Sequence, residues 1–209
     1  MCTTVSQIDA SKHQLRRDIL AMRFQLPEGE CQEAAILLAQ RALELPELAS
    51  ARTVAAYVSV GREPGTRPLL DALRARGTHV LLPVLMPDND LDWGGYEGPE
   101  TLERAGRGLL EPSGPRYGPD AVTQADVVLL PGLAVDGQGM RMGRGGGSYD
   151  RVLARIEAGV RAGSSPVLAV LLYDHEVLGE VPAEPHDRPV QAAVTPSKVH
   201  RFTDNRSAH

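Results

Sequence analysis

Residues 127–155 hold the strongest candidate for chemistry in this chain, a glycine-rich segment suited to binding phosphate groups. An apolar run at 127–131 stops at Pro131-Gly132, and two arginines, Arg141 and Arg144, follow among many glycines. Glycine lets backbone N–H groups approach an anion closely, and a helix start adds partial positive charge. Arginine adds planar donors that match phosphate oxygens. The order of strand, loop and helix therefore predicts a polyphosphate-binding loop with six glycines (Gly137, Gly139, Gly143, Gly145, Gly146 and Gly147).

This loop matches neither of the two common nucleotide-binding motifs. No Gly-Lys-Ser/Thr follows the glycines, so it is not a P-loop. The third glycine after Gly137-Gln138-Gly139 comes one place too late for the dinucleotide-binding fingerprint. A flexible surface loop is the alternative interpretation. The arginines at the start of a helix favour anion binding over mere flexibility.

A second basic pair, Lys12 and Arg16, is predicted near the start of the first helix. Ser11 and Gln14 fit a capping box that opens this helix, and an apolar stripe follows (Leu15, Ile19, Met22 and Leu26). Residues four apart share a helix face, and two cations at the positive end of a helix are unfavourable without an anion nearby. The pair is therefore either an anion-binding face or an ordinary solvated basic face.

Composition limits the classes of function that are compatible with this chain. Its 209 residues are 42% hydrophobic and 23% charged, as in an ordinary globular protein. The net charge of −5 and the 4% content of aromatic residues argue against a nucleic-acid partner. Two cysteines make neither a disulfide framework nor a metal cluster, and no apolar run is long enough to span a membrane. Because the first residues lack the apolar core of a signal peptide, we expect a cytoplasmic protein.

Strands and helices alternate along the chain. Expected strands lie at 53–60, 79–85, 126–131, 167–173 and 190–195, and expected helices at 11–26, 30–45, 66–76 and 148–162. The region 87–120 is irregular, and we expect a short hairpin or excursion followed by a long loop. This alternation predicts a three-layer, Rossmann-like α/β fold with a mostly parallel sheet and helices on both faces. We expect one domain over residues 1–209, with flexible ends at about 1–8 and 200–209.

In open α/β sheets, ligands bind outside the carboxyl ends of the strands. Glu63 follows the strand at 53–60, and the glycine loop follows the strand at 126–131. Asp174 follows the strand at 167–173, with His186-Asp187 further on. The sequence therefore predicts that these residues meet at one edge of the sheet.

Five elements of the chain, in the same order, resemble the 5-formyltetrahydrofolate cyclo-ligase family. The most specific is the segment from Pro131 to Asp136 followed by Gly139-Met140-Arg141-Met142-Gly143 and Gly145-Gly146-Gly147-Ser148-Tyr149-Asp150-Arg151. The others are Lys12-His13-Gln14-Leu15-Arg16, Glu63-Pro64-Gly65-Thr66, Glu111-Pro112, and residues 182–195 with their Pro-x-Glu-x-His-Asp pattern. The resemblance covers most of the chain.

The resemblance implies an enzyme that uses ATP and Mg²⁺ to convert 5-formyltetrahydrofolate to 5,10-methenyltetrahydrofolate, releasing ADP and phosphate. A formyl group on nitrogen is amide-like, and its oxygen is a poor leaving group. Phosphorylation of that oxygen makes it a good leaving group, so that N10 can attack the formyl carbon and close the ring. Phosphoryl transfer needs positioning and charge stabilisation more than a protein nucleophile. The resemblance also implies a reduced folate and ATP as substrates. From the sequence as a whole we expect no nucleic-acid partner, no membrane partner, and a monomer.

The resemblance also implies a role for each matching residue. ATP would contact Lys12, Arg16, Arg141, Met142, Gly143, Arg144, Gly145, Gly146, Gly147, Ser148 and Tyr149. Lys12 and Arg144 would be the catalytic residues, with Arg144 reaching the transferred phosphoryl group. The folate would contact Val58, Glu63, Arg144, Gly145, Gly147 and Ser148. Asp150 and Asp187 would hold Mg²⁺, which takes one or two carboxylates together with phosphate oxygens and water.

The chain departs from the family pattern at three places. Ser148 stands where the family usually has an aromatic residue, Pro64-Gly65 replaces Val-Asp, and Gln191 stands where aspartate is common. These changes keep two alternatives open. One is a phosphotransfer enzyme with another small substrate, and the other is a nucleotide- or folate-binding protein without turnover.

Overall fold

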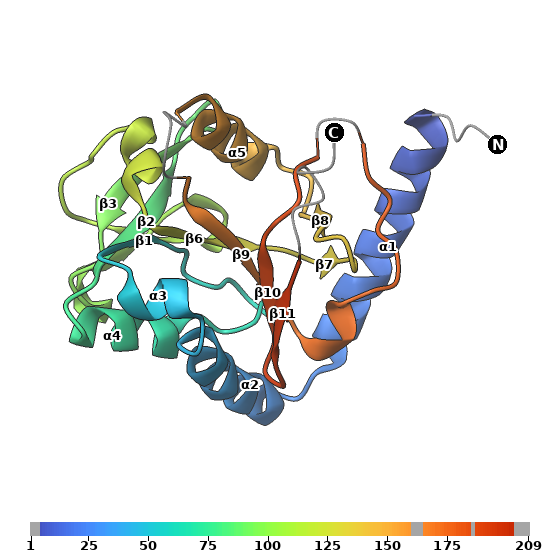
Figure 1. Cartoon of the computed structure of the whole chain (residues 1–209), viewed down its shortest axis with the longest axis horizontal. Helices are drawn as coiled ribbons and strands as arrows, with labels where there is room; N and C mark the ends of the chain where they lie inside the picture. The colour runs from blue at the N-terminus through green and yellow to red at the C-terminus, as the bar shows by residue number, and fades with distance from the viewer. Residues whose placement is uncertain (1–4, 160–164, 185–186, 203–209) are drawn as a thin grey trace.

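A seven-stranded sheet forms the centre of the computed structural model, which describes residues 5–159, 165–184 and 187–202 (Figure 1). The strand order is β11-β10-β9-β6-β1-β2-β3. The five inner strands are parallel, and β3 and β11 add antiparallel edges. The prediction of a mostly parallel sheet is therefore confirmed. The strands are β1 Thr53–Ala55, β2 His79–Leu85, β3 Leu91–Gly95, β6 Val127–Pro131, β9 Val167–Leu171, β10 Ala192–Val194 and β11 Val199–Arg201.

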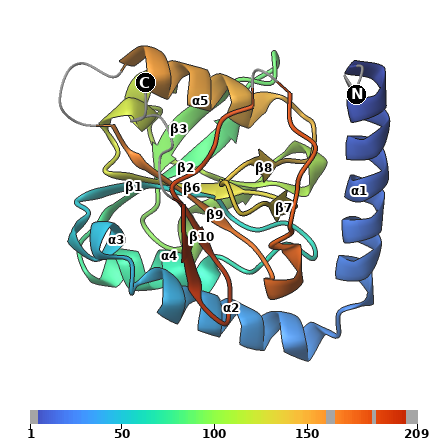
Figure 2. The same cartoon turned by 45° about the vertical axis from the view of Figure 1, so that its right-hand side comes forward.

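Helices cover both faces of this sheet, as the sequence predicted. Helices α2 (Glu28–Ala42), α3 (Pro46–Ser50) and α4 (Arg67–Ala75) lie on one face, and α5 (Ser148–Gly159) lies on the other with the 3-10 helix η3 (Pro119–Gln124) (Figures 1 and 2). Successive side chains of a strand point to opposite faces. In β6, Val127 and Leu129 accordingly join the core under α2–α4, whereas Val128 and Leu130 join the core under α5.

Two short β-ribbons and several 3-10 turns lie beside the central sheet. The ribbon of β4 (Leu102–Arg104) and β5 (Leu110–Pro112) extends from the β3 edge, and β7 (Ala134–Val135) pairs with β8 (Arg141–Met142) within the glycine-rich segment. The 3-10 turns are η1 (Pro99–Thr101), η2 (Gly106–Gly108) and η4 (Asp174–Glu176). The expected excursion at 87–120 is thus a sheet strand followed by a ribbon, and Trp93 of β3 is fully buried.

Helix α1 (Val5–Gln25) begins earlier than the sequence predicted. Ser11 lies inside the helix, so the predicted capping box is wrong, and the Gln14 amide instead donates to Asp18. The predicted apolar stripe is also partly wrong, because Met22 is 44% exposed while Arg23 is 1% exposed. Figure 2 shows α1 standing along one side of the molecule beside β7 and β8. Ile19 packs there against Met142 and Leu133.

Element boundaries also differ from the sequence-based expectation. Strand β1 ends at Ala55, and residues 56–60 continue buried or half-buried beyond it, with the Ala56 N–H donating to the Leu81 carbonyl of β2 at 2.8 Å. Helix α2 ends at Ala42, and Pro46 starts the separate helix α3. At the ends predicted to be flexible, residues 5–8 belong to α1 and residues 199–201 form β11, whereas residues 1–4 and 203–209 lie outside the described residues. Residues 160–162 of the helix expected at 148–162 also lie outside them.

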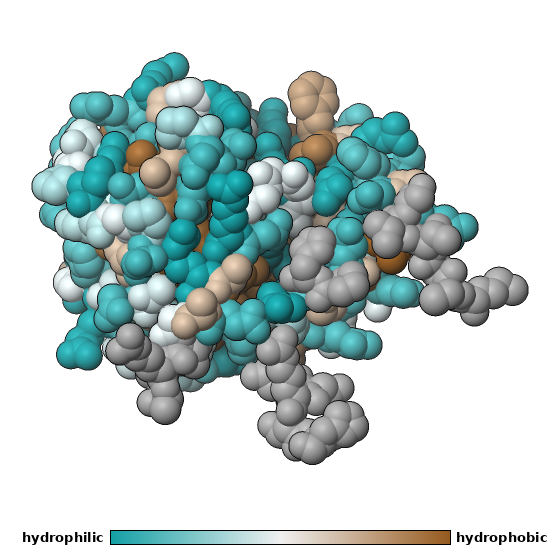
Figure 3. All heavy atoms as spheres, turned by 90° about the horizontal axis from the view of Figure 1, so that it is seen from above, coloured by the Kyte–Doolittle hydropathy of each residue, from teal (hydrophilic) through white to brown (hydrophobic). Residues whose placement is uncertain are grey.

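Hydrophilic side chains dominate the face of the molecule in Figure 3, with small apolar patches between them. Within the described ranges, no helix combines the length and the apolar character needed to cross a bilayer. The larger apolar side chains left exposed are Leu20, Met22, Phe24, Ile36 and Tyr117.

Candidate active site

A cavity of about 320 Å³ opens where β1 and β6 lie side by side. The chain runs from β1 toward one edge of the sheet and from β6 toward the other, so this is the topological switch point where α/β folds bind ligands. Three groups of residues line it. Tyr57, Val58, Val60 and Glu63 follow β1; Pro131 ends β6, and Gly132 and the glycine loop follow it; and β2, β3 and the β4–β5 ribbon add an apolar wall of Pro83, Leu85, Leu91, Leu109 and Leu110.

The glycine loop of the cavity is shorter than the predicted one. Gly137 and Gly139 lie in the turn of the β7–β8 ribbon, away from the cavity, so their prediction as part of the phosphate loop is wrong. Residues 143–147 line the cavity, and α5 begins directly after them at Ser148. Gly145 and Gly147 have φ of +87° and +77°, which L side chains rarely adopt. Exposed backbone, glycine conformations and a helix start therefore coincide here.

Arg16 of α1 contacts this loop from outside the cavity. Its Nε donates to the carbonyl oxygen of Gly143 at 3.1 Å. A Cβ added at Gly145 would lie 3.3 Å from Cζ of Arg16, so glycine lets the guanidinium approach the loop. The predicted convergence of α1 with the glycine loop is thus present, and Arg16 brings positive charge to it.

Lys12 is 4% exposed, so the alternative of a solvated basic face is wrong for this residue. Its Nζ lies 2.6 Å from both Asp187 and Glu184 carboxylate oxygens, and the Glu184 N–H donates to Asp187 at 2.7 Å. Burial lowers the pKa of Lys12, but hydrogen bonds and charges of the two carboxylates outweigh it and raise the pKa above its ordinary value. Lys12 is therefore a buried, permanently charged ammonium next to Asp187.

Arg141 contacts Asp150, one of the two predicted metal ligands. Its Nη1 donates to the Pro131 carbonyl at 3.0 Å, and its Nη2 lies 3.4 Å from Asp150. Burial lowers the pKa of Arg141, whereas the charges of Asp150 and Asp187 oppose that shift. The charges of both carboxylates therefore act on the same guanidinium.

Met142, the neighbour of Arg141, has its side chain in the small core against α1, so only its backbone remains to contact a ligand. Ser148 lines the cavity and is half-buried. Within the described ranges, no cluster of three or more His, Cys, Asp or Glu side chains could hold a metal ion alone. His186 of the sequence motif lies outside those ranges.

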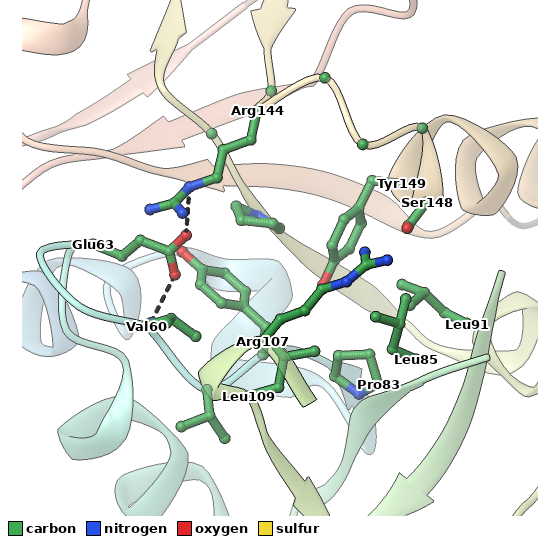
Figure 4. Close-up of a pocket in the computed structure, with 18 of the residues that line it drawn as sticks. Val60, Glu63, Pro83, Leu85, Leu91, Arg107, Leu109, Arg144, Ser148 and Tyr149 are labelled. Carbon is green, nitrogen blue, oxygen red and sulfur yellow. Dashed lines mark hydrogen bonds and ion pairs between the residues drawn. The ribbon is translucent and has the colours of Figure 1, made fainter. Parts of the chain in front are cut away.

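Glu63 and Arg144 contact each other in the lining of the cavity (Figure 4). Arg144 Nε lies 3.2 Å from one carboxylate oxygen of Glu63, and the other accepts the Val60 N–H at 2.8 Å. Arg144 has a half-exposed side chain, whereas that of Glu63 is 10% exposed. The carboxylate of Glu63, held in place after β1, thus contacts the long, half-exposed side chain of Arg144 from the glycine loop.

Two tyrosines complete the inner wall, the buried Tyr57 and the half-buried Tyr149, whose hydroxyl oxygen is itself buried. The Tyr149 hydroxyl has no hydrogen-bond partner among the described residues. Burial, with the charge of Glu63, raises the pKa of both Tyr149 and Tyr57. Both phenols therefore stay protonated at neutral pH and offer O–H donors to a ligand.

The sequence alone did not indicate that Tyr57, Glu184, Arg107 and the apolar wall belong to the site. Glu184 was visible in the Pro-x-Glu-x-His-Asp pattern but was given no role. The wall comes from β2, β3 and the β4–β5 ribbon. The sequence had no local signal for which strand neighbours β1, so these residues could not be brought to the site in advance.

A family model described as the 5-formyltetrahydrofolate cyclo-ligase family matches residues 8–196. The chain belongs to this family. It is 43% identical over 195 residues to the 5-formyltetrahydrofolate cyclo-ligase of Mycolicibacterium smegmatis, covering 90% of this chain and 95% of the relative. The cyclo-ligase of Escherichia coli K12 is 33% identical over 175 residues, covering 83% and 93%.

Solved structures agree with this membership. The 5,10-methenyltetrahydrofolate synthetase of Aquifex aeolicus superposes with a TM-score of 0.77 at 28% identity, covering 95% of this chain and 96% of that one. The synthetase of Mycoplasma pneumoniae, at 19% identity and a TM-score of 0.67, shares the fold. This cyclo-ligase is thus a ligase of folate one-carbon metabolism that converts 5-formyltetrahydrofolate to 5,10-methenyltetrahydrofolate.

Proposed function

We propose that the reaction is driven by ATP with Mg²⁺ and occurs in the cavity between the glycine loop and Glu63. The observation that carries this proposal is the 3.2 Å approach of Arg144 to Glu63. One residue belongs to the phosphate-binding loop and the other to the wall that follows β1. A phosphoryl donor on the loop and a folate against the wall would therefore meet at Arg144.

The nucleotide fits the glycine loop. Backbone N–H groups of residues 143–147, the start of α5 and the guanidinium of Arg16 all supply positive potential at one place. Lys12, Arg141, Met142, Ser148 and Tyr149 would complete the contacts to ATP. Lys12 and Arg144 would be the catalytic residues, because their cations can offset the charge that develops on the transferred phosphoryl group.

The donor set also fits Mg²⁺. Asp150 and Asp187 are hard oxygen ligands, and Mg²⁺ commonly takes one or two carboxylates and completes its shell with phosphate oxygens and water. In that position the ion would neutralise phosphate charge. Asp150 would then exchange its 3.4 Å contact with Arg141 for the ion, which leaves Arg141 free to donate elsewhere.

The folate fits the remaining surface. Val58 and the apolar wall would contact the flat ring system, and the fixed carboxylate of Glu63 would accept its N–H groups. Gly145, Gly147 and Ser148 would approach it from the loop. The small Ser148 leaves room there, and the buried hydroxyl of Tyr149 offers a donor. Once the formyl oxygen is phosphorylated it can leave as phosphate, and N10 closes the ring.

We further propose one catalytic domain that acts as a monomer in the cytoplasm, without nucleic-acid or membrane partners. The single site built from both ends of the chain supports this organisation, since Lys12 and Asp187 belong to the same cluster.

Ultraviolet absorbance tests the proposal directly, because the methenyl product has a chromophore that the formyl substrate lacks. Purified protein with 5-formyltetrahydrofolate should give absorbance only when both ATP and Mg²⁺ are added. Asp150→Asn should reduce turnover by at least ~100-fold with the fold intact, since removing a charged group at a phosphoryl-transfer centre costs several kcal/mol. Product formation without ATP, or wild-type turnover of Asp150→Asn at limiting Mg²⁺, contradicts it.

A further inference from the structure

Arg107 lies in the turn η2 that joins β4 to β5, and its side chain lines the cavity. Figure 4 shows it reaching from the ribbon across the space beside the apolar wall, with its guanidinium directed away from Glu63 and toward the side of Leu85 and Leu91. No motif in the sequence pointed to this residue.

The backbone at Arg107 has a left-handed conformation that non-glycine residues rarely adopt. Arg107 has φ of +60°, and the residue that accepts from it, Asn89, has φ of +65°. They are the two non-glycine residues with positive φ in the described part of the chain, and they contact each other, with Nη1 of Arg107 3.2 Å from Oδ1 of Asn89. Such conformations persist where surrounding structure holds them, and they gather at binding sites.

The neighbouring carboxylates are already paired with other cations. Asp88 and Asp90 flank Asn89, but Asp90 lies 2.6 Å from Arg155 and Asp88 lies 3.6 Å from Arg151, both on α5. Arg107 is left with a neutral amide oxygen.

The other two arginines that line the cavity have acidic partners, since Arg141 contacts Asp150 and Arg144 contacts Glu63. Across the described residues, no carboxylate lies within ion-pair distance of Arg107. Among the arginines that line the cavity in the described part of the chain, Arg107 is therefore the one without a carboxylate partner.

We propose that Arg107 binds the carboxylates of the glutamate tail of the folate. This inference rests on the proposed function, because it takes the folate to lie along the apolar wall with its formyl group near Arg144. The tail must then leave the cavity away from the glycine loop, along the side formed by the β4–β5 ribbon and the β2–β3 turn. A guanidinium matches a carboxylate with two parallel hydrogen bonds, which an amide oxygen cannot use.

A substrate whose tail carries no charge tests whether Arg107 binds the tail carboxylates. Steady-state kinetics would compare 5-formyltetrahydrofolate with its diamide, in which both tail carboxylates are carboxamides. Arg107→Asn removes the charge and keeps a residue that tolerates positive φ. It should raise KM for the folate by ~10-fold, as expected for loss of a charge-assisted contact, and leave KM for the diamide and for ATP unchanged. Arg107→Lys should restore part of the preference for the folate.

Arg104→Ala is the matched control, because it removes the same charge from an exposed position on the same ribbon outside the cavity. It should leave both substrates unchanged. An equal loss for folate and diamide, a raised KM for ATP, or no change in Arg107→Asn overturns the inference. If the wild-type protein converts neither substrate, the proposed function fails first; if it converts the folate but Arg107 has no effect, the inference alone fails.

Discussion

The ammonium of Lys12 lies 2.6 Å from the carboxylate of Asp187, although 175 positions separate the two residues in the chain. The family resemblance implies different tasks for them, contact with ATP phosphates for Lys12 and Mg²⁺ binding for Asp187. Their contact means that the two tasks are linked. In the proposed function, Asp187 would bind an ion beside the phosphates, and Lys12 would then exchange its carboxylate partner for a phosphate oxygen.

Replacing Lys12 by alanine should therefore affect both ATP use and stability. Loss of a charge-assisted phosphate contact should weaken ATP use by roughly 10- to 150-fold. Because Lys12 is buried between two carboxylates, its loss should also lower the free energy of unfolding by roughly 1–3 kcal/mol. Melting curves with and without Mg²⁺-ATP measure both effects, and the ATP-induced shift should shrink in the variant.

Arg17→Ala on the exposed side of α1 serves as the control and should keep the wild-type ATP shift. An equal shift in Lys12→Ala and the wild type would mean that Lys12 is a structural cation without a nucleotide role.

The glycine loop gives a second prediction, at Gly145. Its φ of +87° and the nearby guanidinium of Arg16 both oppose a side chain. Gly145→Val should weaken ATP binding, measured by calorimetry, by at least ~10-fold or about 1.4 kcal/mol. Gly137→Val is the matched control, since its φ is not positive, a Cβ there meets no atom within 4 Å, and it does not line the cavity. If both variants bind ATP equally well, the loop conformation does not determine binding.

The sequence was sufficient for the elements that depend on local pattern. Alternating apolar runs identified the parallel sheet, and the glycine loop with Arg16 identified one side of the cavity. Burial of charged residues could not be predicted. By pattern, Met22 belonged to the apolar face of α1, yet Arg23 occupies that position because Glu176, 153 residues away, neutralises it. Partners at such separations leave no trace in helical periodicity.

That ion pair gives a third prediction, about folding. Arg23 donates from Nε to Glu176 at 2.6 Å and from Nη2 to the Gly132 carbonyl at 2.7 Å, with side chains 1% and 0% exposed. Glu176→Gln should lower the free energy of unfolding by about 3–5 kcal/mol, because it leaves a buried guanidinium without its counter-charge. Urea denaturation measures this loss.

The control is an exposed ion pair at the end of α2, between Arg41 and Glu44. Glu44→Gln should change the free energy of unfolding by less than about 0.5 kcal/mol. Similar losses in the two variants would contradict the view that Glu176 anchors α1 to the sheet.

Asp90 gives the last prediction, about acid stability. Its carboxylate accepts from Arg155 of α5 at 2.6 Å, which ties the β2–β3 turn to that helix beside Arg107 and Asn89. The hydrogen bond from Arg155 lowers the pKa of Asp90 against the opposing effect of burial. A carboxylate whose pKa is lower in the folded state stabilises the protein above its unfolded pKa of about 3.9, and this contribution is lost as pH falls through the folded pKa.

Asp90→Asn should therefore be less stable than the wild type at pH 7, by on the order of 1 kcal/mol for a charge-assisted hydrogen bond at a partly exposed site. The difference should shrink as pH falls below about 3.9, because protonation removes the same charge from the wild type. Denaturation at a series of pH values between 7 and 2 measures this convergence. Glu103→Gln on β4, an exposed carboxylate, should stay within about 0.5 kcal/mol of the wild type. A difference between Asp90→Asn and the wild type that stays constant down to pH 2 would show that the amide disturbs the turn by its shape and that the charge of Asp90 contributes nothing.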